Sequence, residues 1–153
     1  MKKSLLIVVS LVILCSVNFA VDQKVIPAGS VLDGNLNVGK MSVRIEKGAE
    51  VKGNIFIEEG DLFIGSEVDI NGSITIKKGN IFIKSKVDVS KTVNVQNGNF
   101  SMADKNVLKG SISCRKGIVG MGKENVVKGD IHARGLKQGS GNQLKGKFYK
   151  CSH

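Results

Sequence analysis

The chain has few side chains suited to catalysis or metal binding, and their spacing does not assemble a site. His132 is isolated and His153 is the last residue, with no row of Cys, Asp or His that could complete a metal site. The acidic pair Glu58 and Glu59 lies among lysines, as acids in solvated turns do. The sequence has no glycine-rich phosphate loop, no nucleophile elbow and no calcium-binding repeat. We therefore expect no catalytic residue, no cofactor and no bound metal.

Two cysteines outside the N-terminal segment, Cys114 and Cys151, are the remaining reactive groups. In the repeat described next they fall about two coils, or roughly 10 Å, apart, which exceeds disulfide reach unless the tail folds back. We expect a buried, apolar Cys114 and a free or intermolecularly paired Cys151. A bond between the two is the alternative.

A repeat of 19 residues must position every side chain of this protein. Three columns of apolar residues recur at this period, six or seven residues apart, so the chain returns to an interior three times per repeat. This pattern is typical of a β-solenoid. We predict an all-β fold, a single-stranded, three-sided, right-handed parallel β-helix of about six coils over residues 21–153. The columns are Ile26, Ile45, Ile64, Ile83, Met102 and Met121; Leu32, Val51, Ile70, Val89, Leu108 and Val127; and Val38, Ile57, Ile76, Val95, Cys114 and Ala133.

Other columns of the repeat predict its corners. Glycines recur where a tight corner needs positive φ or close backbone approach. A column of small polar residues beside the first glycine column predicts a side-chain ladder at that corner. The glycine columns are Gly34, Gly53, Gly72, Gly110 and Gly129, and Gly60, Gly79, Gly98 and Gly117; the polar column is Asn35, Asn54, Ser73, Thr92, Ser111 and Asp130.

The first 20 residues form a separate segment. A basic Met-Lys-Lys start precedes a mostly apolar run over residues 5–14, and Ala20 is a small residue suited to cleavage. This pattern predicts a signal peptide over residues 1–20 and an exported protein of the periplasm, cell surface or medium. The run is short for a transmembrane span, which needs about 20 apolar residues. Retention as a membrane anchor is the alternative.

Positive charge is concentrated in the C-terminal half. The net charge is +10, and from Ser90 onward twelve Lys and Arg outnumber three Asp and Glu, whereas residues 21–89 are close to neutral. On an exported rod, this basic half predicts binding of anionic glycans or other envelope polyanions, although no nucleic-acid motif accompanies it. The alternative is that cations spread over several sides of the coil only keep the protein soluble. The candidates are Lys109, Arg115, Lys116, Lys128, Arg134, Lys145 and Lys147.

The ends of the rod predict self-association. An exposed solenoid end is a row of unpaired backbone groups. The N-terminal end opens with the apolar residues Ile26, Val31 and Leu32. The final coil is two residues short, and we expect the polar or small residues Ser140, Gly146 and Lys150 in its inward columns. We therefore expect two copies to meet through their N-terminal ends.

Three phenylalanines offer a second self-association surface. Phe63 and Phe82 are one period apart at outward positions, and Phe56 is outward on a neighbouring side. We expect Phe63 and Phe82 to be exposed and stacked, and a contiguous apolar patch of this kind usually has a partner. The alternative is that residues 21–25 cover them.

The repeat resembles that of bactofilins, bacterial polymer-forming β-helix proteins. The similar segments are Ala28–Leu36, Gly48–Ile55 and Gly60–Val68, and the resemblance covers most of the chain after residue 20. It implies a right-handed, three-sided β-helix that assembles end to end without nucleotide and acts as a scaffold near the membrane or cell wall. Bactofilins are typically cytoplasmic, whereas the signal pattern predicts export here.

We therefore expect an exported, self-associating structural protein rather than an enzyme. A secreted, adhesin-like protein that binds polyanions is the second hypothesis. A carbohydrate-active enzyme is the third, because longer β-helices often have that activity.

Overall fold

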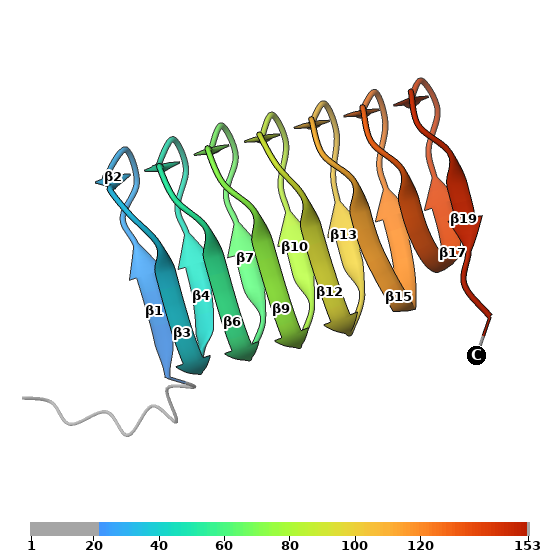
Figure 1. Ribbon diagram of the computed structural model, residues 1–153. Helices are drawn as coiled ribbons and strands as arrows, with labels where there is room; N and C mark the ends of the chain where they lie inside the picture. The colour runs from blue at the N-terminus through green and yellow to red at the C-terminus, as the bar shows by residue number, and fades with distance from the viewer. Residues whose placement is uncertain (1–21, 153) are drawn as a thin grey trace, which may run out of the picture.

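Residues 22–152, which the computed structural model describes, wind into a parallel β-solenoid of about seven turns with roughly 19 residues per turn (Figure 1). The all-β solenoid is therefore confirmed, with one turn more than the six expected. These residues contain no helix, and thus none long and apolar enough to cross a membrane. The predicted signal peptide lies outside the described residues.

Each turn contributes one strand to each of three faces, which we number in chain order. Face 1 contains β1 (Gln23–Ile26), β4 (Ser42–Ile45), β7 (Leu62–Ile64), β10 (Ile81–Ile83), β13 (Phe100–Met102) and the second parts of β15 (Ile112–Met121) and β17 (Ile131–Gln138). Face 2 contains β2 (Val31–Leu32), β5 (Glu50–Val51), β8 (Asp69–Ile70), β11 (Asp88–Val89), β14 (Val107–Leu108), β16 (Val126–Val127) and β18 (Gln143–Leu144). Face 3 contains β3 (Leu36–Lys40), β6 (Ile55–Glu59), β9 (Ile74–Lys78), β12 (Val93–Asn97), the first parts of β15 and β17, and β19 (Phe148–Lys150).

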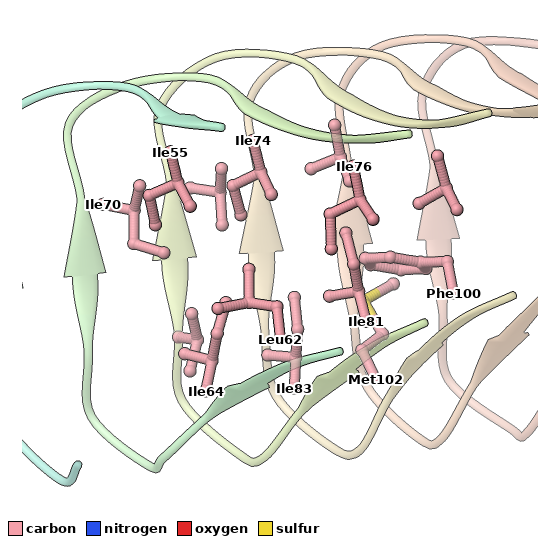
Figure 2. Close-up of a cluster of buried hydrophobic side chains, with 14 of the residues drawn as sticks. Ile55, Leu62, Ile64, Ile70, Ile74, Ile76, Ile81, Ile83, Phe100 and Met102 are labelled. Atoms are coloured by element: carbon pink, nitrogen blue, oxygen red, sulfur yellow. The ribbon is translucent and has the colours of Figure 1, made fainter. Parts of the chain in front are cut away.

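Stacking in register builds the core. Ile57 pairs with Ile76 across neighbouring strands, so side chains 19 residues apart lie on top of one another. Figure 2 shows the apolar side chains of the three faces pointing into one interior. Ile57, Ile76 and Val89 are each 0% exposed. Burying such a side chain contributes about 1.5–3 kcal/mol before entropy is counted, so the repeated columns stabilise the rod.

Close approach between turns explains the glycine corners. Gly98 has φ +151°, and a Cβ atom there would overlap the carbonyl group of Gly79 in the turn before. Gly72 lacks a positive φ, but a Cβ atom there would overlap the carbonyl group of Gly53. The requirement at Gly72 is therefore contact between turns, whereas Gly98 also needs the backbone conformation.

The predicted polar ladder forms beside the first glycine column. The backbone nitrogen of Asn54 donates to Oδ1 of Asn35 at 2.8 Å, and that of Ser73 donates to Oδ1 of Asn54 at 2.9 Å. The same contact recurs at the C-terminal end, where Lys147 N donates to Asp130 Oδ1 at 2.8 Å. These bonds satisfy corner N–H groups that no neighbouring strand reaches.

A second ladder, of asparagines, lies inside the core and was not predicted. Asn106 and Asn125 are 0% exposed and occupy the inward column that holds Val68 and Val87 in earlier turns. Asn125 passes the ladder to Asn142, whose Oδ1 accepts from Asn125 N at 2.8 Å. The column changes from apolar to amide along the rod, so hydrophobic periodicity alone does not reveal it.

The register of the final turn corrects the sequence prediction. The two-residue deletion lies at the corner after Ala133, because β15 and β17 change register between Cys114 and Ile118. Gln138, Leu144 and Lys150 therefore pair with Met121, Val127 and Ala133 in the inward columns. Only Lys150 was predicted there; Ser140 lies in a turn, and Gly146 continues the first glycine column.

Candidate functional site

The N-terminal end of the rod is an open strand edge. Among residues 22–152, β1, β2 and β3 each pair on one side only, with β4, β5 and β6. Of the residues predicted to associate there, Ile26 is buried, Leu32 is half-buried and Val31 is 52% exposed. Val31 points outward on face 2, as Val25, 49% exposed, does on face 1. The prediction that Val31 extends an inward column was therefore wrong.

The phenylalanine surface divides between two faces. Phe63 and Phe82 on face 1 stack with their ring centroids 5.2 Å apart, as predicted. Arg44 extends this column, with its guanidinium 5.6 Å from the centre of the Phe63 ring. Phe56 lies on face 3, where Lys77 Nζ is 5.4 Å from its ring centre. The patch is therefore two rings capped by an arginine rather than three rings.

The first strand extends the phenylalanine column and does not cover it. Val25 pairs with Arg44, which pairs with Phe63, so the three side chains lie in successive turns of one column. The residues of β1 thus leave Phe82 42% exposed. A shallow hollow of about 270 Å³ runs beside the two rings, between Glu46 and Lys84 at the next corner.

The predicted cations gather in two groups, although the sequence analysis placed them on several sides. Lys109, Lys128 and Lys145 form one column at the edge of face 2, since each follows an in-register residue of that face. Lys109 Nζ lies 3.0 Å from Asp88 Oδ2, so the first member of the column is paired. Lys147 lies two residues beyond Lys145, in the polar ladder.

The second group forms a cleft at the C-terminal end of face 3, which we call the basic cleft. It holds the predicted residues Arg115, Lys116 and Arg134, and its volume is about 660 Å³. Its other side chains were not predicted: His132, Tyr149, Lys150, Cys151 and Ser152. The signal was present in the sequence, because Arg115 and Arg134 are one period apart and so lie in adjacent turns.

An aromatic pair forms one wall of the basic cleft. His132 and Tyr149 pair across β17 and β19, and their rings stack 4.7 Å apart and nearly parallel, at 10°. The sequence analysis treated His132 as an isolated surface residue, which was wrong. The deletion of two residues brings Tyr149, rather than Cys151, into this register.

Charge on face 3 is balanced in the N-terminal turns and not in the basic cleft. Lys77 Nζ lies 3.3 Å from Glu58 Oε1, and Lys40 Nζ lies 3.9 Å from Glu59 Oε2. Further along the same columns the acids disappear, and none of the eight residues lining the basic cleft carries a side-chain carboxylate. The cleft can therefore attract and hydrogen-bond an anion.

The described residues contain no group of three or more His, Cys, Asp and Glu placed to hold a metal ion. Both described cysteines are free, with Cys114 buried, as predicted. Burial raises the pKa of the Cys114 thiol, which makes it a poor nucleophile. Its sulfur donates to Gly98 O at 3.2 Å, a packing role in the core.

Comparisons of the chain with protein-family models, curated proteins and solved structures give no match in any of the three. The resemblance to bactofilins thus rests on the repeat motif and stays a prediction.

Proposed function

We propose that this protein is an exported structural protein of the cell envelope or surface, a rod that associates with a second copy of itself through its N-terminal end. The observation that carries the proposal is the edge of β1, β2 and β3, whose outer side pairs with no residue between 22 and 152. Such an edge is a template for strand pairing with another chain. Export rests on the signal pattern of residues 1–20.

The backbone of the first turn has hydrogen-bonding groups directed at this edge. Ile26 O and Leu32 O accept from nitrogens of the second turn at 2.9 Å each. Because alternate residues of a strand bond to opposite sides, the backbone groups of Val25 and Val31 point away from the second turn. A second copy would satisfy them on several faces at once.

The two ends differ in ways that favour contact between N-terminal ends. At the N-terminal end, Ile26, Leu36 and Val38 keep the inward columns apolar. At the other end, Gln138 and Lys150 occupy inward columns and are exposed, and the surrounding half of the chain is basic. Two C-terminal ends would repel each other, and a head-to-tail contact would bury Lys150 against an apolar column. A symmetric dimer of N-terminal ends avoids both costs.

Light scattering on the mature chain, residues 21–153, tests the proposal. We expect the mass of two copies at high protein concentration. The double variant Val25→Lys and Val31→Lys should give one copy, because it places four like charges across the interface while replacing side chains that are already exposed. Circular dichroism should show an unchanged β signal.

Phe82→Lys is the matched control, since it adds a charge on an exposed apolar position in the middle of face 1. It should leave the dimer intact. Loss of the dimer in this control would move the contact to the phenylalanine column, and a wild-type chain that stays a single copy or forms open polymers would refute the N-terminal dimer.

A further inference from the structure

The basic cleft continues into a second hollow along face 3. Arg115 and Lys116 line both, and the second hollow, of about 390 Å³, is otherwise lined by β12 and Ser113. Together they form one groove that runs along the rod across the turns of β12, β15, β17 and β19, at the C-terminal end in Figure 1. An elongated groove suits an extended ligand better than a compact one.

The two arginines of the groove are placed for repeated anionic groups. Arg115 and Arg134 follow the paired residues Cys114 and Ala133, so their backbones are one strand spacing, about 4.8 Å, apart. A guanidinium binds a carboxylate or another oxyanion through two parallel N–H donors. Lys116 and Lys150 add point charges on either side of them.

The rest of the groove offers neutral hydrogen-bonding groups. Asn94, Gln96, Asn97 and Ser113 line the second hollow. Amide and hydroxyl side chains both donate and accept hydrogen bonds. This is the property needed to bind the hydroxyl groups of a sugar, which also donate and accept.

The aromatic pair argues against nucleic acid as the ligand. Single-stranded nucleic acids bind largely by stacking each base on an open aromatic face. His132 and Tyr149 stack on each other, so each ring covers one face of the other. The pair therefore presents ring edges, a hydroxyl and imidazole nitrogens, which are hydrogen-bonding groups.

We propose that the groove binds an acidic polysaccharide. Arg115 and Arg134 hold oxyanion groups of successive sugars, Lys116 and Lys150 add attraction, and the polar side chains of β12 and Ser113 bind sugar hydroxyls. The surface is distinct from the N-terminal edge, so the proposal does not depend on the association of two copies.

Titration calorimetry of the mature chain with alginate oligomers, heparin oligomers and neutral dextran tests this assignment. We expect alginate or heparin to bind and dextran not to bind. Affinity should fall as NaCl is raised, because the screening length shrinks from about 30 Å at 0.01 M to about 8 Å at 0.15 M ionic strength. Failure of both acidic glycans to bind at low salt would overturn the proposal.

A pair of double variants separates the groove from general charge. Arg115→Gln with Arg134→Gln should weaken binding at least about tenfold, because charge-assisted hydrogen bonds are lost. Lys128→Gln with Lys145→Gln removes the same charge from the edge of face 2 and should weaken it by less than about threefold. Both pairs replace exposed side chains, so the fold should be kept.

Two outcomes would overturn the proposal. Equal losses in the two double variants would mean that net charge, not the groove, attracts the glycan. Tighter binding of oligo(dT) than of either glycan at the same salt, lost in the arginine variant, would make the groove a nucleic-acid site.

Discussion

Asn125 Oδ1 accepts two hydrogen bonds from Asn106, one from the backbone nitrogen at 2.9 Å and one from Nδ2 at 3.1 Å. Asn106 Oδ1 in turn accepts only from the backbone nitrogen of Val87, at 2.9 Å. Both amides lie in the core, where an unpaired donor is costly. The two residues should therefore differ in their contribution to stability.

Asn125→Val should lower the free energy of unfolding by about 2–4 kcal/mol, since it leaves two donors of Asn106 without an acceptor. Asn106→Val should cost only about 1–2 kcal/mol, because it strands the single Val87 N–H and extends the apolar column by one turn. Urea unfolding followed by circular dichroism measures both. Equal losses would contradict the direction of the ladder.

This column also shows where sequence reasoning stopped. The inward columns with one residue type, such as Ile45, Ile64 and Ile83, could be predicted because burial requires apolar side chains. The asparagine column could not be found in this way, since Val87 and Asn106 share a position but not a polarity. Its signal is the period, not the hydrophobicity.

The basic cleft was missed for a related reason. Arg115 and Arg134 were identified as cations, but the sequence was read for charge rather than for register. The 19-residue offset already places them in adjacent turns. Tyr149 required more, because its partner His132 is 17 residues away and the position of the deletion follows from the backbone corner at Arg134.

Inward and outward positions should respond differently to charge. Ile76 is fully buried, so Ile76→Asp should cost more than about 4 kcal/mol and unfold the rod. Thr75 is half-buried on the outer side of the same strand, so Thr75→Asp should change stability by less than about 1 kcal/mol. Thermal unfolding compares them, and similar midpoints would contradict the assignment of the faces.

Glycines of β15 and of the corner before it should also differ. Gly98→Ala should cost about 1–3 kcal/mol, because φ is +151° and the methyl group would meet Gly79. Gly120→Ala should be neutral or stabilising, since its nearest neighbour, Ser101 Oγ, is 3.7 Å from the added methyl group. Urea midpoints test the pair, and equal midpoints would show that contact between turns does not decide the corner.

A left-handed corner offers a stabilising change. Lys86 has φ +62°, at a corner position where Gly48 has φ +71°. Relief of this strain, about 1–2 kcal/mol, exceeds the entropy cost of glycine, about 0.5–1 kcal/mol. Lys86→Gly should therefore raise the free energy of unfolding slightly, while Lys78→Gly, in strand β9, should lower it. Equal losses in both would contradict strain at the corner.

The buried thiol should make stability depend on pH. Burial raises the pKa of Cys114, so the folded state binds its proton more tightly than the unfolded state. The resulting stabilisation is fully present below the pKa of an unfolded cysteine, about 8.5, and is lost as pH rises through the higher folded pKa. Between pH 8 and 10, the wild type should therefore lose more stability than Cys114→Ala, a change to the residue found at Ala133 in the next turn. A thiol reagent should modify half-buried Cys151 quickly and Cys114 only as the protein unfolds, whereas equal labelling rates in the folded protein, or parallel pH profiles for the two chains, would show that Cys114 is not held in the core.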